Sequence, residues 1–313
     1  EGILTALELL NARKEGYKEM GIKYYQPWLV VITDGAPQGP NAMANMNLAI
    51  EACNELEKND KLVIFNIGVG SATDFDDKLW YKTLAKTLVI DEYITKHSAI
   101  MDRYDPEKQI GLMVDEWGTW YDVEPGTNPG FLYQQSTIRD ALVAGINLNI
   151  FNKHCDRVKM ANIAQLVNVL QAVILTEGDQ MIKTPTYHVF KMYSAHQDNT
   201  LVESSIETTK IGLEEDFMVP NLTESVSKSA DGKIHITLTN LSCDEAYDID
   251  TALAGSVVKA VKGSIITGKM TDKNTFDEPE NVKEVSFDDV KFEGEKICFK
   301  IPACSVLHLE VEI

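Results

Sequence analysis

The sequence predicts an α/β region followed by an all-β domain, and two observations support this. Up to about residue 196, segments with helical spacing of apolar residues alternate with short, continuous apolar runs, as in helices that connect strands of a parallel sheet. After about residue 200, short segments of alternating polar and apolar residues follow one another with turn residues between them. This second pattern is typical of an antiparallel β-sandwich.

The order of these patterns gives the expected elements. Continuous apolar runs predict buried parallel strands at 28–33, 62–70, 110–116 and 146–151. Helical spacing predicts helices at 3–19, 41–57, 78–104, 132–144, 158–174 and 186–195. The four strands can share one open parallel sheet with right-handed crossovers, but they are too few to close an eight-stranded barrel.

Composition restricts the class of protein. A net charge of −19 and a pI of about 4.7 disfavour nucleic acid and anionic membranes as partners, whereas a neutral carbohydrate is little affected by this charge. No apolar run is long enough for a membrane span. Five scattered cysteines without a CxxC pair predict reduced thiols and a cytoplasmic protein. The chain opens directly on a helical pattern, which suggests that it continues a longer chain.

The stretch LMVDEWGTWY, residues 112–121, carries the strongest chemical signal. Glu116 lies where a buried strand ends, and Trp117 and Trp120 follow it. A carboxylate beside indole rings favours a sugar-binding site, and carboxylates that cleave glycosides normally act in pairs. We expect Asp115 to be a structural hydrogen-bond partner, and Trp117 to belong either to the core or to the site.

Other catalytic patterns are missing from the sequence. The six histidines form no HxxxH pair, and no G-x-S-x-G turn or glycine-rich phosphate loop occurs. The sequence therefore predicts neither a zinc site nor a bound cofactor.

From GSATDFDDKLWY onward, the chain resembles the C-terminal half of a glycoside hydrolase family 51 α-L-arabinofuranosidase. The resemblance is carried by HSAIMDRYDP, by the segment from GLMVDEWGTWYDVEPGTNPG to AVILTEG, and by TPTYHVFKMYSAHQ. It implies a (β/α)8 barrel followed by a β-sandwich, and release of terminal arabinofuranosyl groups from arabinan or arabinoxylan with retention of configuration. Arabinose-containing oligosaccharides are then the partners, and a homo-oligomer is an open option.

The same resemblance assigns individual residues. Glu116 corresponds to the nucleophile of the D-E-W motif, Trp120 to a tryptophan that walls the sugar subsite, and Gln165 to a glutamine that hydrogen-bonds the arabinose. From the residues alone, Gln165 lies on a predicted helix and is equally a buried structural amide. These assignments divide residues 71–313 into a barrel part, 71–198, and a sandwich, 199–313.

The acid/base glutamate of that family lies in an Asn-Glu pair upstream of the nucleophile. The only such pair here is Asn54-Glu55, in the middle of a predicted helix. We therefore expect the acid/base to be missing from this chain, which then hydrolyses natural arabinosides little or not at all. Asp34 is one alternative partner for Glu116, because both follow parallel strands.

Residues 1–70 resemble part of a von Willebrand factor A-type domain of the tellurium-resistance-like kind. The stretch YYQPWLVVITDGAPQGP, a helix and IFNIGVG carry this resemblance. It implies that Asp34 is one ligand of a Mg²⁺ site, although the Asp-x-Ser-x-Ser loop that supplies the other ligands is not present. The alternatives are a metal-dependent binding protein and an Asp34 that merely caps a turn at Gly35.

Overall fold

The computed structural model describes residues 2–20, 28–31, 48, 51, 63–66 and 71–313. The chain divides into two compact units, Glu1–Val69 and Gly70–Ile313. In the first unit, helix α1 (Gly2–Glu19) covers the helix predicted at 3–19, and strands β1 (Trp28–Val31) and β2 (Val63–Asn66) pair in parallel. Asp34 and Asn54-Glu55 lie outside the described residues.

The second unit begins with a β-α-β arrangement. Helix α3 (Asp77–Met101) precedes strand β3 (Leu112–Trp117), and helix α4 (Ile138–Lys153) connects β3 to the parallel strand β4 (Val158–Ile163). The loop between β3 and α4 includes a short 3₁₀ turn, η1 (Pro129–Phe131). Strands β1 and β2 pair with each other, and β3 and β4 do likewise, so the described residues form two separate parallel pairs.

The predicted strand at 146–151 is wrong, because helix α4 runs through it. The Thr137 side chain accepts from the Arg139 backbone, and the Asp140 carboxylate accepts from the Thr137 backbone at 2.7 Å, which together form a capping box. The run INLNIF was ambiguous because a short apolar run does not distinguish a strand from a buried helix. Helix α4 is buried along nearly its whole length, so apolar residues occur on most of its faces.

The predicted helix at 158–174 is also wrong. Its first residues form β4, a loop follows, and an antiparallel hairpin of β5 (Ile174–Glu177) and β6 (Gln180–Lys183) comes next. Gly178 allows the tight turn of this hairpin with its φ of +59°. Parallel pairing with β3 overrides the helical pattern, because hydrogen bonds to a neighbouring strand outweigh weak local propensity.

The all-β prediction for the C-terminal region is confirmed by two antiparallel sheets. One has six strands in the order β14-β13-β17-β11-β10-β7, and the other has three in the order β12-β16-β15. Their bounds are β7 (Thr200–Leu201), β10 (Leu222–Lys228), β11 (Ile234–Asn240), β12 (Tyr247–Ala252), β13 (Ala260–Thr267), β14 (Val285–Phe287), β15 (Val290–Glu293), β16 (Lys296–Ile301) and β17 (Ser305–Glu312). The remaining short elements are α5 (Pro185–Tyr193), η2 (Ser194–His196), β8 (Lys210–Ile211), η3 (Glu215–Phe217) and β9 (Val219–Pro220).

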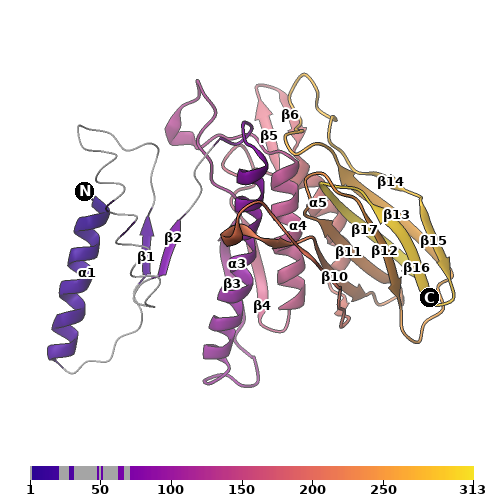
Figure 1. The fold of residues 1–313 in the computed structure, drawn as a ribbon, viewed down its shortest axis with the longest axis horizontal. Helices are drawn as coiled ribbons and strands as arrows, with labels where there is room; N and C mark the ends of the chain where they lie inside the picture. Colours follow the sequence, from indigo (N-terminus) through magenta and orange to yellow (C-terminus); the bar gives the residue numbers. More distant parts are fainter. Residues whose placement is uncertain (1, 21–27, 32–47, 49–50, 52–62, 67–70) are drawn as a thin grey trace. The chain divides into compact units, whose positions relative to one another are not determined.

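Two large hydrophobic cores and one small cluster around Leu175 hold this unit together. One joins α3, α4, α5, β3 and β4 to one face of the six-stranded sheet through residues such as Trp80, Ile146 and Val306. The other fills the space between the two sheets, with Ile297 and Leu309 fully buried. In Figure 1, helices α4 and α5 lie beside the six-stranded sheet. The helical part and the sandwich therefore share one core.

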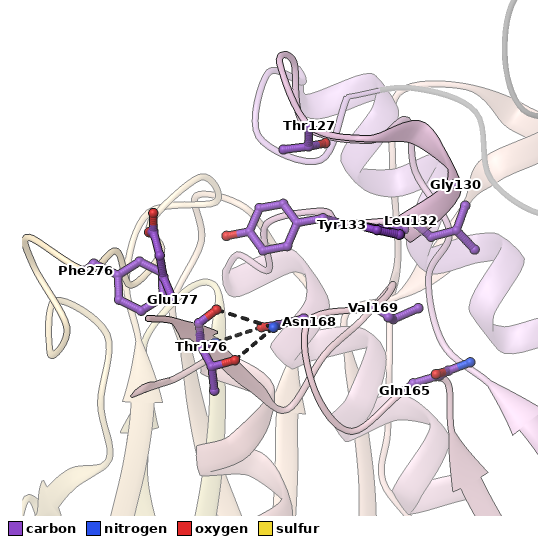
Figure 2. Close-up of a pocket in the computed structure, with 11 residues that line it drawn as sticks. Thr127, Gly130, Leu132, Tyr133, Gln165, Asn168, Val169, Thr176, Glu177 and Phe276 are labelled. Carbon is purple, nitrogen blue, oxygen red and sulfur yellow. Dashed lines mark hydrogen bonds between the residues drawn. The ribbon is translucent and has the colours of Figure 1, made fainter. Parts of the chain in front are cut away.

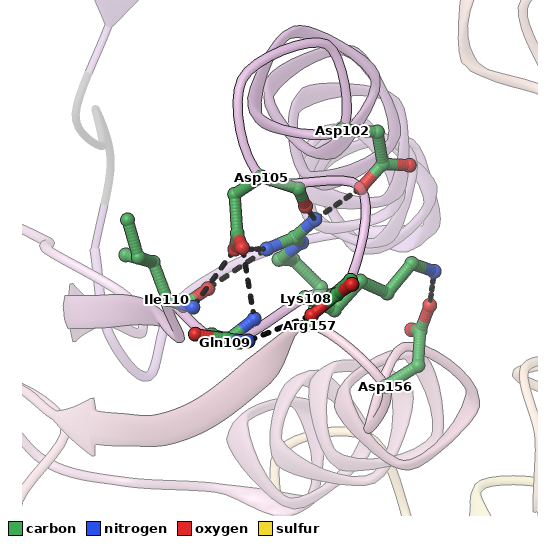
Figure 3. Close-up of polar contacts among 8 residues, drawn as sticks. Asp102, Asp105, Lys108, Gln109, Ile110, Asp156 and Arg157 are labelled. Atoms are coloured by element: carbon green, nitrogen blue, oxygen red, sulfur yellow. Dashed lines mark hydrogen bonds and ion pairs between the residues drawn. The ribbon is translucent and has the colours of Figure 1, made fainter.

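A buried arginine fixes the start of β3 (Figure 3). Arg157 donates to the Asp105 carboxylate at 2.7 Å, to the Ile110 carbonyl at 2.9 Å and to the Asp102 carboxylate. Its own carbonyl accepts from the Leu112 N–H at 2.7 Å. Because these contacts close the loop between α3 and β3 onto the beginning of β4, they set the position from which β3 runs to Glu116.

Candidate active site

Glu116 is an exposed residue near the carboxyl end of β3. The pairing of β3 with β4 shifts register between Val114 and Trp117, which marks a bulge at this point. Bulges change the direction of side chains at the ends of strands. Within the described residues, the Glu116 carboxylate forms no hydrogen bond or ion pair. It is therefore open to a ligand from solvent.

Gln165 lies at the same edge of the sheet, in the loop after β4 and not on a helix as predicted. Trp117 pairs with Ile163, and the Ala164 N–H donates to the Trp117 carbonyl at 2.9 Å. The Gln165 side chain is exposed and lines a pocket (Figure 2). The ends of two adjacent parallel strands thus bring Glu116 and Gln165, which are far apart in sequence, to one edge.

The two tryptophans near Glu116 have different surroundings. Trp117 is 6% exposed, stacks on Phe190 with a centroid distance of 5.8 Å, and meets Phe151 edge-on at 5.5 Å. Trp117 is therefore a core residue, which resolves the alternative left open by the sequence. Trp120 is only partly buried, so part of its surface remains accessible to a ligand.

A buried polar network holds the segment that follows Glu116. The Thr119 N–H donates to the Gln171 side-chain oxygen at 2.9 Å, and the Thr119 hydroxyl donates to the Asp140 carboxylate at 2.7 Å. Gln171 donates in turn to the Asp140 carbonyl at 2.7 Å. Gly118 has a φ of +126°, and a Cβ there would lie 3.1 Å from the Gln171 oxygen, so this position favours glycine.

Asp140 lies at the centre of this network. Burial raises the pKa of its carboxyl group, while Arg139 and the hydrogen bonds from Thr137 and Thr119 act in the opposite direction. Sequence reasoning missed Asp140 and Gln171. The pattern Thr137-x-x-Asp140 before an apolar run is a capping-box signature, so the role of Asp140 could have been found, but nothing marked Gln171.

Arg139 supports the same segment from the other side. Its guanidinium lies between two aromatic rings, 3.6 Å from the Phe75 centroid and 4.1 Å from the Tyr121 centroid. It also donates to the Ser71 and Ala72 carbonyls, each at 3.2 Å. Such stacking is favourable for a desolvated guanidinium. Tyr121 is therefore held in place by the packing around α4.

Metal binding receives no support from the part of the chain that the structure describes. No group of three or more His, Cys, Asp or Glu side chains in that part is placed to hold a metal ion.

A solvent-facing carboxylate at the carboxyl end of a parallel strand, with an exposed amide in the loop after the adjacent strand, is the arrangement expected of a carbohydrate-active α/β protein. The chain matches the family described as the α-L-arabinofuranosidase C-terminal domain over residues 115–305, and it belongs to this family. The match begins at Asp115 and does not extend to segment 1–70.

Individual relatives agree with this membership. An intracellular exo-alpha-L-arabinofuranosidase from Bacteroides ovatus is 46% identical over 244 residues, which are 78% of this chain and 48% of that protein. The GH51 arabinofuranosidase of Xanthomonas axonopodis pv. citri has a TM-score of 0.77 at 44% identity, over 80% of this chain and 52% of that one. The chain thus spans about half the length of the relatives it matches.

A more distant structure shares the fold. The α-L-arabinofuranosidase of Thermotoga maritima, solved as an arabinose complex, has a TM-score of 0.67 at 24% identity, again over 80% of this chain and 52% of that one.

Proposed function

We propose that the protein is a retaining α-L-arabinofuranosidase in which Glu116 is the nucleophile. The observation that carries this proposal is an exposed carboxylate at the carboxyl end of β3, next to the Gln165 loop, in a chain whose relatives are named exo-α-L-arabinofuranosidases. Gln165 hydrogen-bonds the arabinose, and Trp120 forms a wall of the sugar subsite. We also propose that the β-α-β arrangement belongs to a (β/α) barrel and that 71–198 and 199–313 are its barrel and sandwich parts.

In this reaction, a Glu116 carboxylate oxygen attacks the anomeric carbon and forms a glycosyl ester, while the bond to the leaving oxygen breaks. A second carboxyl group, about 5–5.5 Å away, protonates that oxygen and later activates water. We propose that this acid/base is missing from the present chain. Loss of acid assistance costs about 10² to 10⁴ in rate, so unactivated arabinosides should react very slowly.

The test is labelling of Glu116 by an activated aryl arabinofuranoside, whose leaving group needs no proton. We expect intact-protein mass spectrometry to detect one arabinosyl adduct, and peptide mapping to place it on Glu116. Glu116→Gln should abolish the adduct. The matched control is Asp115→Asn, which changes the exposed neighbouring carboxylate and should keep the adduct. An adduct that persists in Glu116→Gln would refute this assignment, and rapid hydrolysis of arabino-oligosaccharides by the chain alone would refute the missing acid/base.

The substrate class and location follow from the same proposal. The substrates are arabinose-containing oligosaccharides, and a homo-oligomer is compatible with the family resemblance. Two relatives are named as intracellular enzymes, and we propose a cytoplasmic location for this protein as well. None of the described helices is long and apolar enough to cross a membrane.

The A-type resemblance of segment 1–70 supports a second, separate proposal, a metal-dependent binding function through Asp34. The parallel pair β1 and β2 within a compact unit is compatible with it. Calorimetric titration with Mg²⁺ should then give a binding heat that Asp34→Asn removes. A titration without heat would reject this function and leave the arabinofuranosidase proposal untouched.

A further inference from the structure

The segment that carries Trp120 has no regular secondary structure. Residues 118–124 follow β3 without forming a helix or a strand. Backbone N–H and C=O groups outside helices and sheets need partners from side chains or from water. Trp120 itself forms no hydrogen bond among the described residues, through either its backbone or its indole. Its position therefore depends on the two residues beside it, Thr119 and Tyr121.

A buried glutamine bridges these two residues. Gln134 is 1% exposed, accepts from the Tyr121 N–H at 2.7 Å and donates to the Thr119 carbonyl at 3.3 Å. Because a backbone N–H can only donate, the Gln134 atom that faces Tyr121 is the amide oxygen, and the amide nitrogen is left for the carbonyl. One side chain thus binds the backbone on both sides of Trp120, as a neighbouring strand would.

The backbone of Gln134 is itself held on both sides. The Gln135 N–H donates to the Glu124 carboxylate at 3.1 Å, and the Glu124 N–H donates to the Tyr133 carbonyl at 2.8 Å. Thr137, the N-terminal cap of α4, follows shortly after. Gln134 therefore reaches the Trp120 segment from a backbone that is anchored to its neighbours.

An aromatic wall acts on a ligand only when the ring meets it at contact distance and with a suitable tilt. Binding groups must be held within about 0.5 Å and 10–20° of the productive position, and hydrogen bonds behind them provide this. Trp120 forms no such bonds of its own. The two Gln134 bonds to the adjoining backbone are therefore the contacts suited to set the direction of the indole.

We infer that Gln134 is a positioning residue for sugar binding that acts through Trp120. It fixes the backbone of residues 119–121 and so aims the indole at the arabinofuranosyl ring. The role of Trp120 as a wall of the sugar subsite rests on the proposed function. The link from Gln134 to Trp120 does not, because the environment of the indole can be measured without a substrate. No hydrogen bond joins Gln134 to Glu116 in the described residues, so we expect an effect on binding and little on the chemical step.

The first experiment replaces the four tryptophans of the full chain by fluorotryptophan and records fluorine NMR spectra without a ligand. Trp120→Phe assigns the Trp120 signal, and the other three signals report whether each variant is folded. Gln134→Leu removes both hydrogen bonds at similar size and should shift or broaden the Trp120 signal. Gln134→Glu keeps an oxygen that accepts from the Tyr121 N–H, so it should shift this signal less.

The matched control is Asn240→Leu, at a buried amide of the sandwich that bridges backbone groups in the same way. Asn240 accepts from the Ser242 N–H at 3.0 Å and donates to the Glu245 carbonyl at 2.9 Å. This variant loses comparable hydrogen bonds and should leave the Trp120 signal unchanged.

The second experiment measures labelling of Glu116 over a range of concentrations of the activated aryl arabinofuranoside, which separates binding from chemistry. Gln134→Leu should raise the half-saturating concentration about fivefold and change the maximal rate by less than about twofold, since it misaligns an aromatic contact. Gln134→Glu should recover part of this loss, and Asn240→Leu should keep the half-saturating concentration.

An unchanged Trp120 signal in folded Gln134→Leu would overturn the inference. A lower maximal rate at an unchanged half-saturating concentration would overturn it as well, because the residue would then act on the chemical step or on stability alone. A Trp120 signal that moves as expected, in a chain that is never labelled at Glu116, would reject the proposed function and keep the link from Gln134 to Trp120.

Discussion

The two ends of helix α4 carry buried polar networks that differ in character. At its N-terminal end, the Asp140 carboxylate accepts from Thr119 and Thr137. In its C-terminal half, the Asn149 side-chain oxygen accepts from the Tyr193 hydroxyl at 2.8 Å and from two hydroxyls of the six-stranded sheet, those of Ser225 and Thr237. One network is centred on a carboxyl group and the other on an amide.

The difference separates two tasks of the same helix. The Asp140 network orders the loop after Glu116, so it acts on the candidate active site. The Asn149 network fastens α4 to the sandwich, since its partners come from α5, β10 and β11. We therefore expect damage to the first network to impair both stability and labelling of Glu116, and damage to the second to impair stability alone.

The largest effect is expected for Asp140→Ala. The change removes the capping box and leaves the Thr119 hydroxyl and the Thr137 N–H without their acceptor, at a cost of about 3 kcal/mol in the free energy of unfolding. Urea unfolding measures this loss, and the rate of adduct formation at Glu116 should fall as well. Asp140→Asn is the matched control, because its side-chain oxygen still accepts a hydrogen bond, and it should lose clearly less stability. Normal adduct formation in folded Asp140→Ala would contradict the positioning role.

A smaller effect is expected for Asn149→Ala, about 2 kcal/mol, because three buried hydroxyls lose a shared acceptor. The same urea titration applies. Adduct formation at Glu116 should keep its rate wherever the protein is folded. If Asn149→Ala slowed the labelling as much as Asp140→Ala, the division between the two ends of α4 would be wrong.

The smallest effect concerns pH and the histidines next to the Asn149 network. The His196 Nε2 atom shares a hydrogen bond of 3.0 Å with the Thr237 hydroxyl. The His235 Nδ1 and His308 Nε2 atoms share another of 3.1 Å. Burial is the main cause that lowers the pKa of His196 to about 3, and the neighbouring His308 and His235 lower it further. Burial is also the main cause that lowers the pKa of His308 to about 4, and His235 adds to it. The folded state thus favours the neutral imidazoles, whereas the unfolded chain takes up protons near pH 6.5.

The contribution of these neutral histidines to the free energy of unfolding is therefore fully present above pH 6.5 and is lost as the pH falls toward 4. Between pH 7 and 5.5 we expect a loss of about 1 kcal/mol for each of His196 and His308. Thermal unfolding over this range measures it, and His308→Leu should give a shallower decline than the natural chain. An unchanged slope in that variant would show that His308 does not contribute to the acid sensitivity.

Much of the fold follows from local pattern. The apolar run at 110–116 and the helical stripe at 78–104 correspond to β3 and α3, and the alternation after residue 200 corresponds to antiparallel strands. The errors fall at α4 and β4. Helix α4 is buried on most of its faces, and the β4 segment VKMANI mixes apolar and polar residues without regular alternation, so periodicity carries little information at either place. Pairing with β3 and packing against the six-stranded sheet determine these two elements.

The sequence by itself determined the family, the position of Glu116 at a strand end and the all-β character of the C-terminal region, because motifs and periodicity are local properties. Only the tertiary structure decided that Gln165 lies in a loop beside Trp117, that Asp140 and Gln171 hold the loop after Glu116, and that Phe276 of the sandwich lines the neighbouring pocket. These contacts join residues far apart in the chain. Packing of whole elements brings them together, and spacing in the sequence does not record it.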